Sequence, residues 1–257
     1  DVHHDSKKCV RPMLYRHLDE AQELGADVMS YGDWGDYMQG RADRRHSKDD
    51  LLPELVSGAY WDKAMDYNAA PLIARPSLAW WMSLGNHETA VRKNNEIDVH
   101  DGLIRRAREG IGADAMIASG GYAGWIRHVF DYGTGSRSHL TYYNHGGGGG
   151  GIVSKGVLWA NRRAAMYPDA DLCVYPHWHE KWSFPIARMR VDKTGKEHNV
   201  IQNHIATGTY KEAVVDVGGV GFEIEKMHAI KPMGGWWFIA YWSARDDDMR
   251  FRFVEAD

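Results

Sequence analysis

Five short segments of the sequence carry side chains suited to binding metal ions, and they are spread over the first 179 residues. They supply carboxylates, one amide and several imidazoles: Asp1 and His3, Asp33 and Asp36, Asn86 and His87, His145, and His177 and His179. Carboxylate, amide-oxygen and imidazole ligands without thiolate suit manganese, iron, nickel, cobalt or zinc. If these segments meet in space, they predict a metal centre.

Each of the four later segments follows a stretch that is predicted to be a β-strand. The apolar run at 78–82 stops at Gly85, which predicts a buried strand that ends in a tight turn before Asn86. Shorter strands are predicted at 27–31, 139–143 and 171–175. Ligands of α/β proteins usually bind at the carboxyl ends of strands. His177 and His179 are two residues apart, so on an extended segment both are expected to point the same way.

Helical spacing of apolar residues accompanies these strands. It predicts a helix from Val10 to Leu24, with Gly25 as its stop, and further helices at 51–59, 99–109 and 157–164. More strands are predicted from residue 124 onward. The alternation favours an α/β fold, and without an internal repeat or a boundary in the sequence we expect one domain over residues 1–257.

Composition narrows the class of protein. In a chain of 257 residues, 44% hydrophobic residues are enough for a sizeable core, and a net charge of -4 argues against nucleic-acid binding by overall charge. Cys9 and Cys173 are far apart, so neither a disulfide framework nor a thiolate zinc site is implied, and a reducing, cytoplasmic location is expected. The apolar run at 236–242 is too short for a membrane helix, so no membrane partner is expected. The sequence predicts no oligomeric state.

Two stretches could contact a substrate phosphate. Arg41, Arg44 and Arg45 lie in a polar loop after the second ligand segment and are either a solvated face or phosphate contacts. A run of six glycines begins after His145; it is either a linker or a place where backbone amides approach a phosphate, with Gly146, Gly147 and Gly148 as the candidates. No Gly-Lys-Ser/Thr follows it, so it is not a Walker loop. The polar stretch at 207–211 could also approach the site.

The motifs in order read Asp-x-His, Gly-Asp-x-x-Asp, Gly-Asn-His-Glu, a lone His after a strand, and His-x-His. As a set they resemble the calcineurin-like metallophosphoesterase superfamily, especially its phage and bacterial members, over residues 1–179. The resemblance implies a four-layer α-β-β-α sandwich of two mixed sheets flanked by helices, with a dinuclear metal site at the strand ends. The C-terminal strands would complete the second sheet.

The resemblance also implies a role for each ligand. Asp1, His3 and His179 would hold one metal, Asn86, His145 and His177 the other, and Asp33 would bridge both. His87 would donate a proton to the leaving oxygen, and Asp36 would orient His87. Two divalent ions are the implied cofactor, with manganese expected and iron, nickel, cobalt or zinc as alternatives.

The sequence departs from the family pattern at two places. Pro176 stands where a glycine usually precedes the first histidine of the last motif. Asp1 is the first residue, whereas the family has a core strand before this aspartate, and we expect the polypeptide to continue upstream rather than to lack that strand.

The substrate class is a further expectation. The second motif continues Asp36-Tyr37-Met38, whereas the protein phosphatases continue Asp-Arg-Gly, so a phosphodiester, such as a nucleotide or nucleic acid, is favoured over a phosphoprotein. A DNA exonuclease or endonuclease of the same superfamily is one alternative, although nuclease members often carry His at the position of Asp36. A non-catalytic, metal-binding scaffold module is the other. Zinc-protease chemistry is disfavoured, because no His-Glu-x-x-His helix is present.

Overall fold

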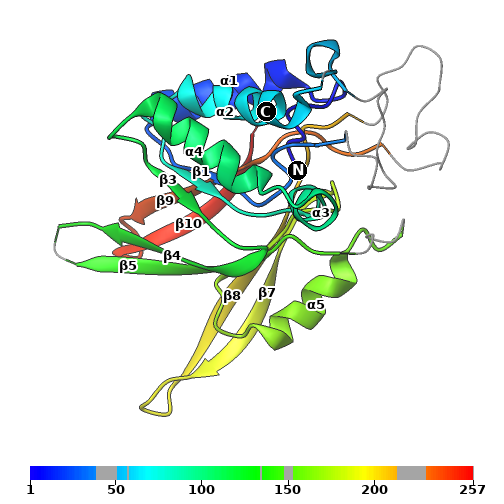
Figure 1. The fold of residues 1–257 in the computed structure, drawn as a ribbon. Coiled ribbons are helices and arrows are strands. Elements are labelled where there is room, and N and C mark those ends of the chain that lie inside the picture. Colours follow the sequence, from blue (N-terminus) through cyan, green and yellow to red (C-terminus); the bar gives the residue numbers. More distant parts are fainter. Residues whose placement is uncertain (39–50, 57, 134, 148–152, 213–229, 257) are drawn as a thin grey trace.

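The computed structural model describes residues 1–38, 51–56, 58–133, 135–147, 153–212 and 230–256 of a mixed α/β protein (Figure 1). One layer is a parallel three-stranded sheet in the order β1 (Val28–Ser30), β2 (Trp80–Met82), β3 (Ile117–Ser119). Helices α1 (Arg11–Leu24), α2 (Tyr60–Ile73) and α4 (Val99–Ile111) pack on it through a shared core that includes Leu18, Leu72, Trp80 and Leu103.

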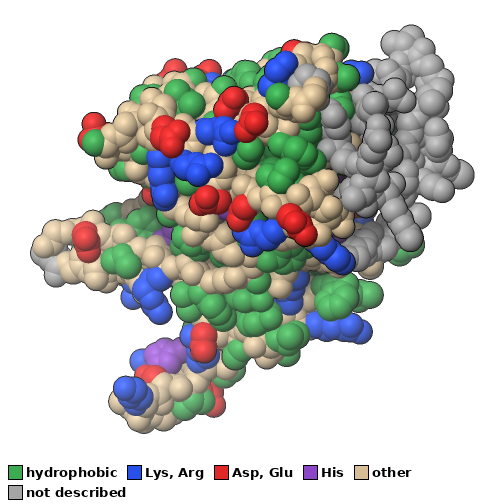
Figure 2. Space-filling view, viewed as in Figure 1, with side chains coloured by type: hydrophobic (Ala, Val, Ile, Leu, Met, Phe, Trp, Pro, Cys, Tyr) green, Lys and Arg blue, Asp and Glu red, His purple; other side chains and the backbone are tan. Residues whose placement is uncertain are grey.

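Local sequence explains where these helices begin and end. Pro12 lies in the first turn of α1, and Gly25 takes a left-handed φ of 61° at its end, as expected from the sequence. Asp98 caps α4 by accepting a hydrogen bond from the Asp101 N–H. Figure 2 shows charges of both signs side by side over the helical layer, where Arg106 of α4 pairs with Asp62 and Asp66 of α2.

A second, mixed sheet has five strands. Its order is β4 (Ala123–Asp131), β5 (Ser136–Asn144), β6 (Leu172–Tyr175), β8 (Glu197–Thr207), β7 (Lys181–Val191), with β6 parallel to both of its neighbours and the outer pairs antiparallel. Helix α5 (Val157–Met166) packs on this sheet and leaves Leu158 and Trp159 exposed.

The last two strands form a sheet of their own. β9 (Trp236–Ser243) and β10 (Asp248–Glu255) are antiparallel and pair only with each other among the described strands. Of the C-terminal strands, β7 and β8 belong to the five-stranded sheet, whereas β9 and β10 do not complete it as expected but pack against its core through Trp236 and Phe253.

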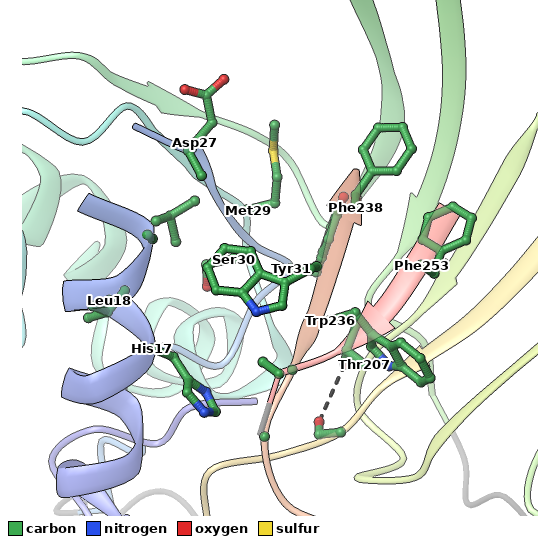
Figure 3. A pocket seen from close by; sticks show the side chains of 18 of the residues that line it. His17, Leu18, Asp27, Met29, Ser30, Tyr31, Thr207, Trp236, Phe238 and Phe253 are labelled. Carbon is green, nitrogen blue, oxygen red and sulfur yellow. Dashed lines mark hydrogen bonds between the residues drawn. The ribbon is translucent and has the colours of Figure 1, made fainter. Parts of the chain in front are cut away.

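An apolar cavity of about 800 Å³ lies between α1, β1 and β9. Figure 3 shows Leu18 of α1, Met29 of β1 and Phe238 of β9 around it. Asp1, a candidate metal ligand described below, also lines the cavity.

One predicted helix is wrong. The described residues of 51–59, which leave out position 57, contain only the short 3₁₀ helix η2 (Pro53–Leu55), and the α-helix begins at Tyr60. Leu51, Leu52 and Leu55 are buried because they pack beneath α2, which produces apolar spacing without an α-helix. The apolar run at 236–242 belongs to strand β9, and no described helix is long and apolar enough to cross a bilayer.

Candidate metal centre

The predicted ligand segments lie at the carboxyl ends of strands from both larger sheets. Asp33 follows β1, Asn86 begins helix α3 (Asn86–Asn95) after β2, and His145 follows β5. The N-terminal segment joins them, because the N–H groups of Val2 and His3 both donate to the carbonyl of Asp33, at 2.9 and 3.0 Å. Figure 1 shows the N-terminus beside α3.

One group of ligands contains Asp1, His3 and His179, the three residues predicted for one metal. Their ligand atoms all lie within 4.8 Å of one another. His3 Nε2 is 3.3 Å from His179 Nε2, which is 3.7 Å from Asp1 Oδ1. Three residues separated by up to 178 positions in the sequence therefore surround one point.

A second group contains Asp33, His145 and His177, again with ligand atoms within 4.8 Å. His145 Nε2 is 3.1 Å from Asp33 Oδ2 and 3.0 Å from Asn86 Oδ1, so the predicted Asn86 joins this group. The two groups adjoin, since His145 Nε2 is also 3.9 Å from Asp1 Oδ1. Whether Asp33 bridges two ions stays a prediction.

The ring orientations leave lone pairs directed at a common space. His145 Nδ1 donates to the carbonyl of Tyr31 at 2.8 Å, and His3 Nδ1 donates to Asp36 Oδ1 at 2.7 Å. In the neutral rings Nε2 then carries no proton, and at His145 it faces two oxygen acceptors. Asp1 Oδ1 is buried and accepts no hydrogen bond from any described residue. Carboxylate oxygens and imidazole nitrogens that lie this close together fit a bound cation.

Burial keeps the rings of His3, His177 and His179 neutral. It lowers the pKa of His3 to about 3 and that of His177 to about 4. It also holds the pKa of His179 well below the usual value. Neutral imidazole is the form that coordinates a metal, so the site needs no proton release from these rings to bind one.

The turn after β6 corrects the expectation of an extended His-x-His segment. His177 and His179 have left-handed φ angles of 71° and 55°, and the Trp178 N–H donates to the carbonyl of Pro176 at 2.8 Å. The two histidines therefore enter different ligand groups rather than pointing the same way. Pro176 does not displace His177, whose N–H anchors Asp1 Oδ2 at 2.6 Å.

His87 lies beside the first group. Its Nδ1 is 2.5 Å from the backbone carbonyl of Asp36 and 3.6 Å from Asp36 Oδ1. Asp36 thus contacts His87 mainly through its backbone, and its carboxylate is bonded to His3 and to Lys211. His3, Asp36 and His87 also form a third possible ligand group, but it shares His3 with the first.

Two acidic residues support the site without belonging to either ligand group. The buried Glu88 carboxylate accepts from the N–H groups of Gly85, Asp33 and Gly35, at 2.8, 3.1 and 3.4 Å, and burial together with Asp33 raises its pKa to about 7. Asp5 accepts from the N–H groups of Asp36 and Tyr37. A glutamate at the third position of a helix signals a capping role, which identifies Glu88 from sequence; no such signal marks Asp5.

The predicted phosphate contacts are only partly described. Arg41, Arg44, Arg45 and Gly148 lie outside the described residues. Gly146 has a φ of 103°, and its N–H donates to Asn144 Oδ1 at 2.9 Å, so that amide already has a partner; Gly147 is exposed. The predicted approach of residues 207–211 is confirmed, because Thr209 Oγ1 donates to the Asp1 carbonyl and Lys211 contacts Asp36.

No protein-family model, curated protein or solved structure matches this chain. Its function is therefore inferred from the site itself.

Proposed function

We propose that this protein is a two-metal-dependent phosphoesterase with the four-layer sandwich of calcineurin-like enzymes. One observation carries the proposal: two adjoining groups of carboxylates and imidazoles place their ligand atoms within 4.8 Å of one another, and a further imidazole, that of His87, stands next to them. A structural ion site would need only one such group. Two groups beside a potential proton donor suit hydrolysis of an ester.

The ligand sets fit two divalent ions. Asp1, His3 and His179 would hold one, Asn86, His145 and His177 the other, and Asp33 both. When bound, two such ions would polarise the phosphoryl oxygens and lower the pKa of water at the site. Mixed oxygen and imidazole donors suit manganese, with iron, nickel, cobalt or zinc as alternatives.

His87 is the proposed proton donor to the leaving oxygen. Its Nδ1 is committed to the Asp36 carbonyl, which fixes the ring and leaves Nε2 directed toward the site, 4.0 Å from Asp33 Oδ2. A protonated His87 can therefore keep its bond to Asp36 while it gives up the Nε2 proton.

A phosphodiester is the proposed substrate class. Tyr37 and Met38, which follow Asp36, are buried against the core beneath α2 and bring no cation to the site. A monoester carries about two negative charges and a diester one, so a site without a guanidinium at this position favours the diester.

The proposal is tested by hydrolysis of bis-p-nitrophenyl phosphate and p-nitrophenyl phosphate after reconstitution with Mn²⁺. We expect faster turnover of the diester, and near-background rates in Asn86→Ala and His177→Ala. His198→Ala is the matched control, because His198 is an exposed histidine on β8 that pairs with Asp192. Full activity in both ligand variants would contradict the proposal.

A panel of mononucleotides, cyclic nucleotides, DNA and RNA separates the remaining possibilities. Preferential cleavage of DNA would identify a nuclease. Two equivalents of bound metal without turnover of any phosphate ester would instead favour a non-catalytic module.

A further inference from the structure

Lys211 reaches the candidate metal centre from a distant part of the chain. Its Nζ is 2.8 Å from Asp36 Oδ1, the same oxygen that lies 2.7 Å from His3 Nδ1. Lys211 has a side chain only 13% exposed, and those of Asp36 and His3 are 2% exposed. One buried carboxylate oxygen therefore accepts from an ammonium group and from the ring of a predicted metal ligand.

The backbone around Lys211 is fixed on both sides of the residue. The Tyr210 N–H donates to the Asp1 carbonyl at 3.1 Å, and the Val10 N–H donates to the Tyr210 carbonyl at 2.8 Å. Beyond Lys211, the Glu212 N–H donates to the Lys8 carbonyl at 2.9 Å. Backbone hydrogen bonds on both sides therefore hold Lys211 against the N-terminal residues, and this fixes where its ammonium group lies.

The contact decides which way Asp36 faces. His87 Nδ1 is 3.6 Å from Asp36 Oδ1 but bonds the Asp36 backbone carbonyl instead, and Asp36 Oδ2 accepts no hydrogen bond from any described residue. An ammonium group at 2.8 Å is a charge-assisted donor and holds the carboxylate where it bonds His3. Because a carboxylate only accepts, His3 must donate from Nδ1 and is left with its Nε2 lone pair facing His179.

We propose that Lys211 is a positioning residue of the metal centre: it holds Asp36 against His3, so that His3 presents Nε2 to the ion that it shares with Asp1 and His179. The inference rests on the proposed two-metal function. Residues that orient a metal-binding histidine through its second nitrogen commonly change metal affinity when they are replaced.

The test is calorimetric titration of Mn²⁺ into metal-stripped full-length protein. In Lys211→Met we expect one of the two binding steps to weaken by about 10- to 100-fold, with the other step unchanged. Lys211→Arg keeps a cationic donor and should recover most of the affinity. Lys193→Met, at an exposed lysine in the turn between β7 and β8, is the matched control and should bind like the wild type.

A double-mutant comparison separates this role from a general loss of structure. If Lys211 acts through Asp36, Lys211→Met should cause no further loss of affinity in an Asp36→Asn background. Equal additional losses in both backgrounds would overturn the inference. Should Lys211→Met not fold, Lys211→Gln keeps a neutral donor and is titrated in its place, with the same weakening of one step expected.

The outcomes also distinguish this inference from the proposed function. A wild-type protein that binds no Mn²⁺ would refute the two-metal proposal itself. Two normal binding steps in the wild type and identical steps in Lys211→Met would overturn only the role of Lys211.

Discussion

In the proposed mechanism His87 donates its proton from Nε2, because its other ring nitrogen, Nδ1, is bonded to the Asp36 carbonyl. An asparagine at this position can place Nδ2 where the ring has Nδ1 and so keep that hydrogen bond, but it has no atom at the position of Nε2. His87→Asn therefore removes the proton donor and leaves the metal ligands in place.

We expect His87→Asn to lower kcat by about 10²- to 10⁴-fold for a diester with an alkyl leaving group, which needs a proton. The loss should be much smaller for a p-nitrophenyl diester, whose leaving group departs without one. Steady-state rates on both substrates, with metal content measured on the same samples, check the prediction. An equal loss on both substrates would argue that His87 supports the site rather than protonates the leaving group.

At the scale of elements, the loops after β1 and β2 must pack closely to bring Asp33 and Asn86 together. Gly85 allows this, because a Cβ at that position would overlap the backbone nitrogen and the carboxylate of Asp33. Glu88, three residues further on, holds both loops through their N–H groups.

We expect Gly85→Ala to displace Asp33, to destabilise the fold by about 1–3 kcal/mol and to remove most of the activity. Gly58→Ala is the control, since a Cβ there meets no described atom within 4 Å, and it should change the free energy of unfolding by less than about 0.5 kcal/mol. Urea unfolding and diesterase assays of the two variants make the comparison. Wild-type activity in Gly85→Ala would show that the loops do not need this close approach.

The helices and strands whose limits depend on residues close by in the sequence could be predicted from sequence. Helix α1 with its Gly25 cap, and the strands that end before Asp33, Asn86 and His145, follow from local apolar spacing and turn residues. The turn at His177 and His179 could not, because its left-handed residues are not glycines and its hydrogen bond to Asp1 joins distant parts of the chain. The Lys211 contact joins positions 175 residues apart, which no local pattern encodes.

Across the whole molecule, the β9–β10 sheet meets the five-stranded sheet around a buried histidine. The His139 ring on β5 lies 4.8 Å from Phe238 of β9 and 4.7 Å from Phe251 of β10, centroid to centroid, and is 3% exposed. Burial lowers its pKa to about 4, with Asp171 opposing the shift and His128 adding to it.

This burial predicts a pH-dependent stability. Because the pKa of His139 in the unfolded chain is about 6.5, the unfolded state takes up the proton first, and stability falls as the pH drops from about 6.5 toward 4. His139→Phe removes the titrating group and suits the aromatic surroundings. When the pH is lowered from 7.5 to 5, the free energy of unfolding of the wild type should fall by about 2 kcal/mol more than that of the variant. Urea unfolding at several pH values tests this, and parallel curves for the two proteins would refute it.

The proposed metals would connect the two larger sheets, because Asp33 and Asn86 follow strands of the three-stranded sheet whereas His145 and His177 follow strands of the five-stranded sheet. Ions that bind only the folded protein stabilise it by about 2.7 kcal/mol at a free concentration one hundred times Kd. For a chain of this size that corresponds to a rise in Tm of about 5–10 °C.

We expect this rise when Mn²⁺ is added to chelator-treated protein, and a clearly smaller one in the double variant Asn86→Ala/His177→Ala. Thermal unfolding followed by circular dichroism measures both. The same Tm with chelator and with saturating Mn²⁺ would mean that the converging acceptors do not bind the ion, and the proposed joining of the two sheets by metal would be wrong.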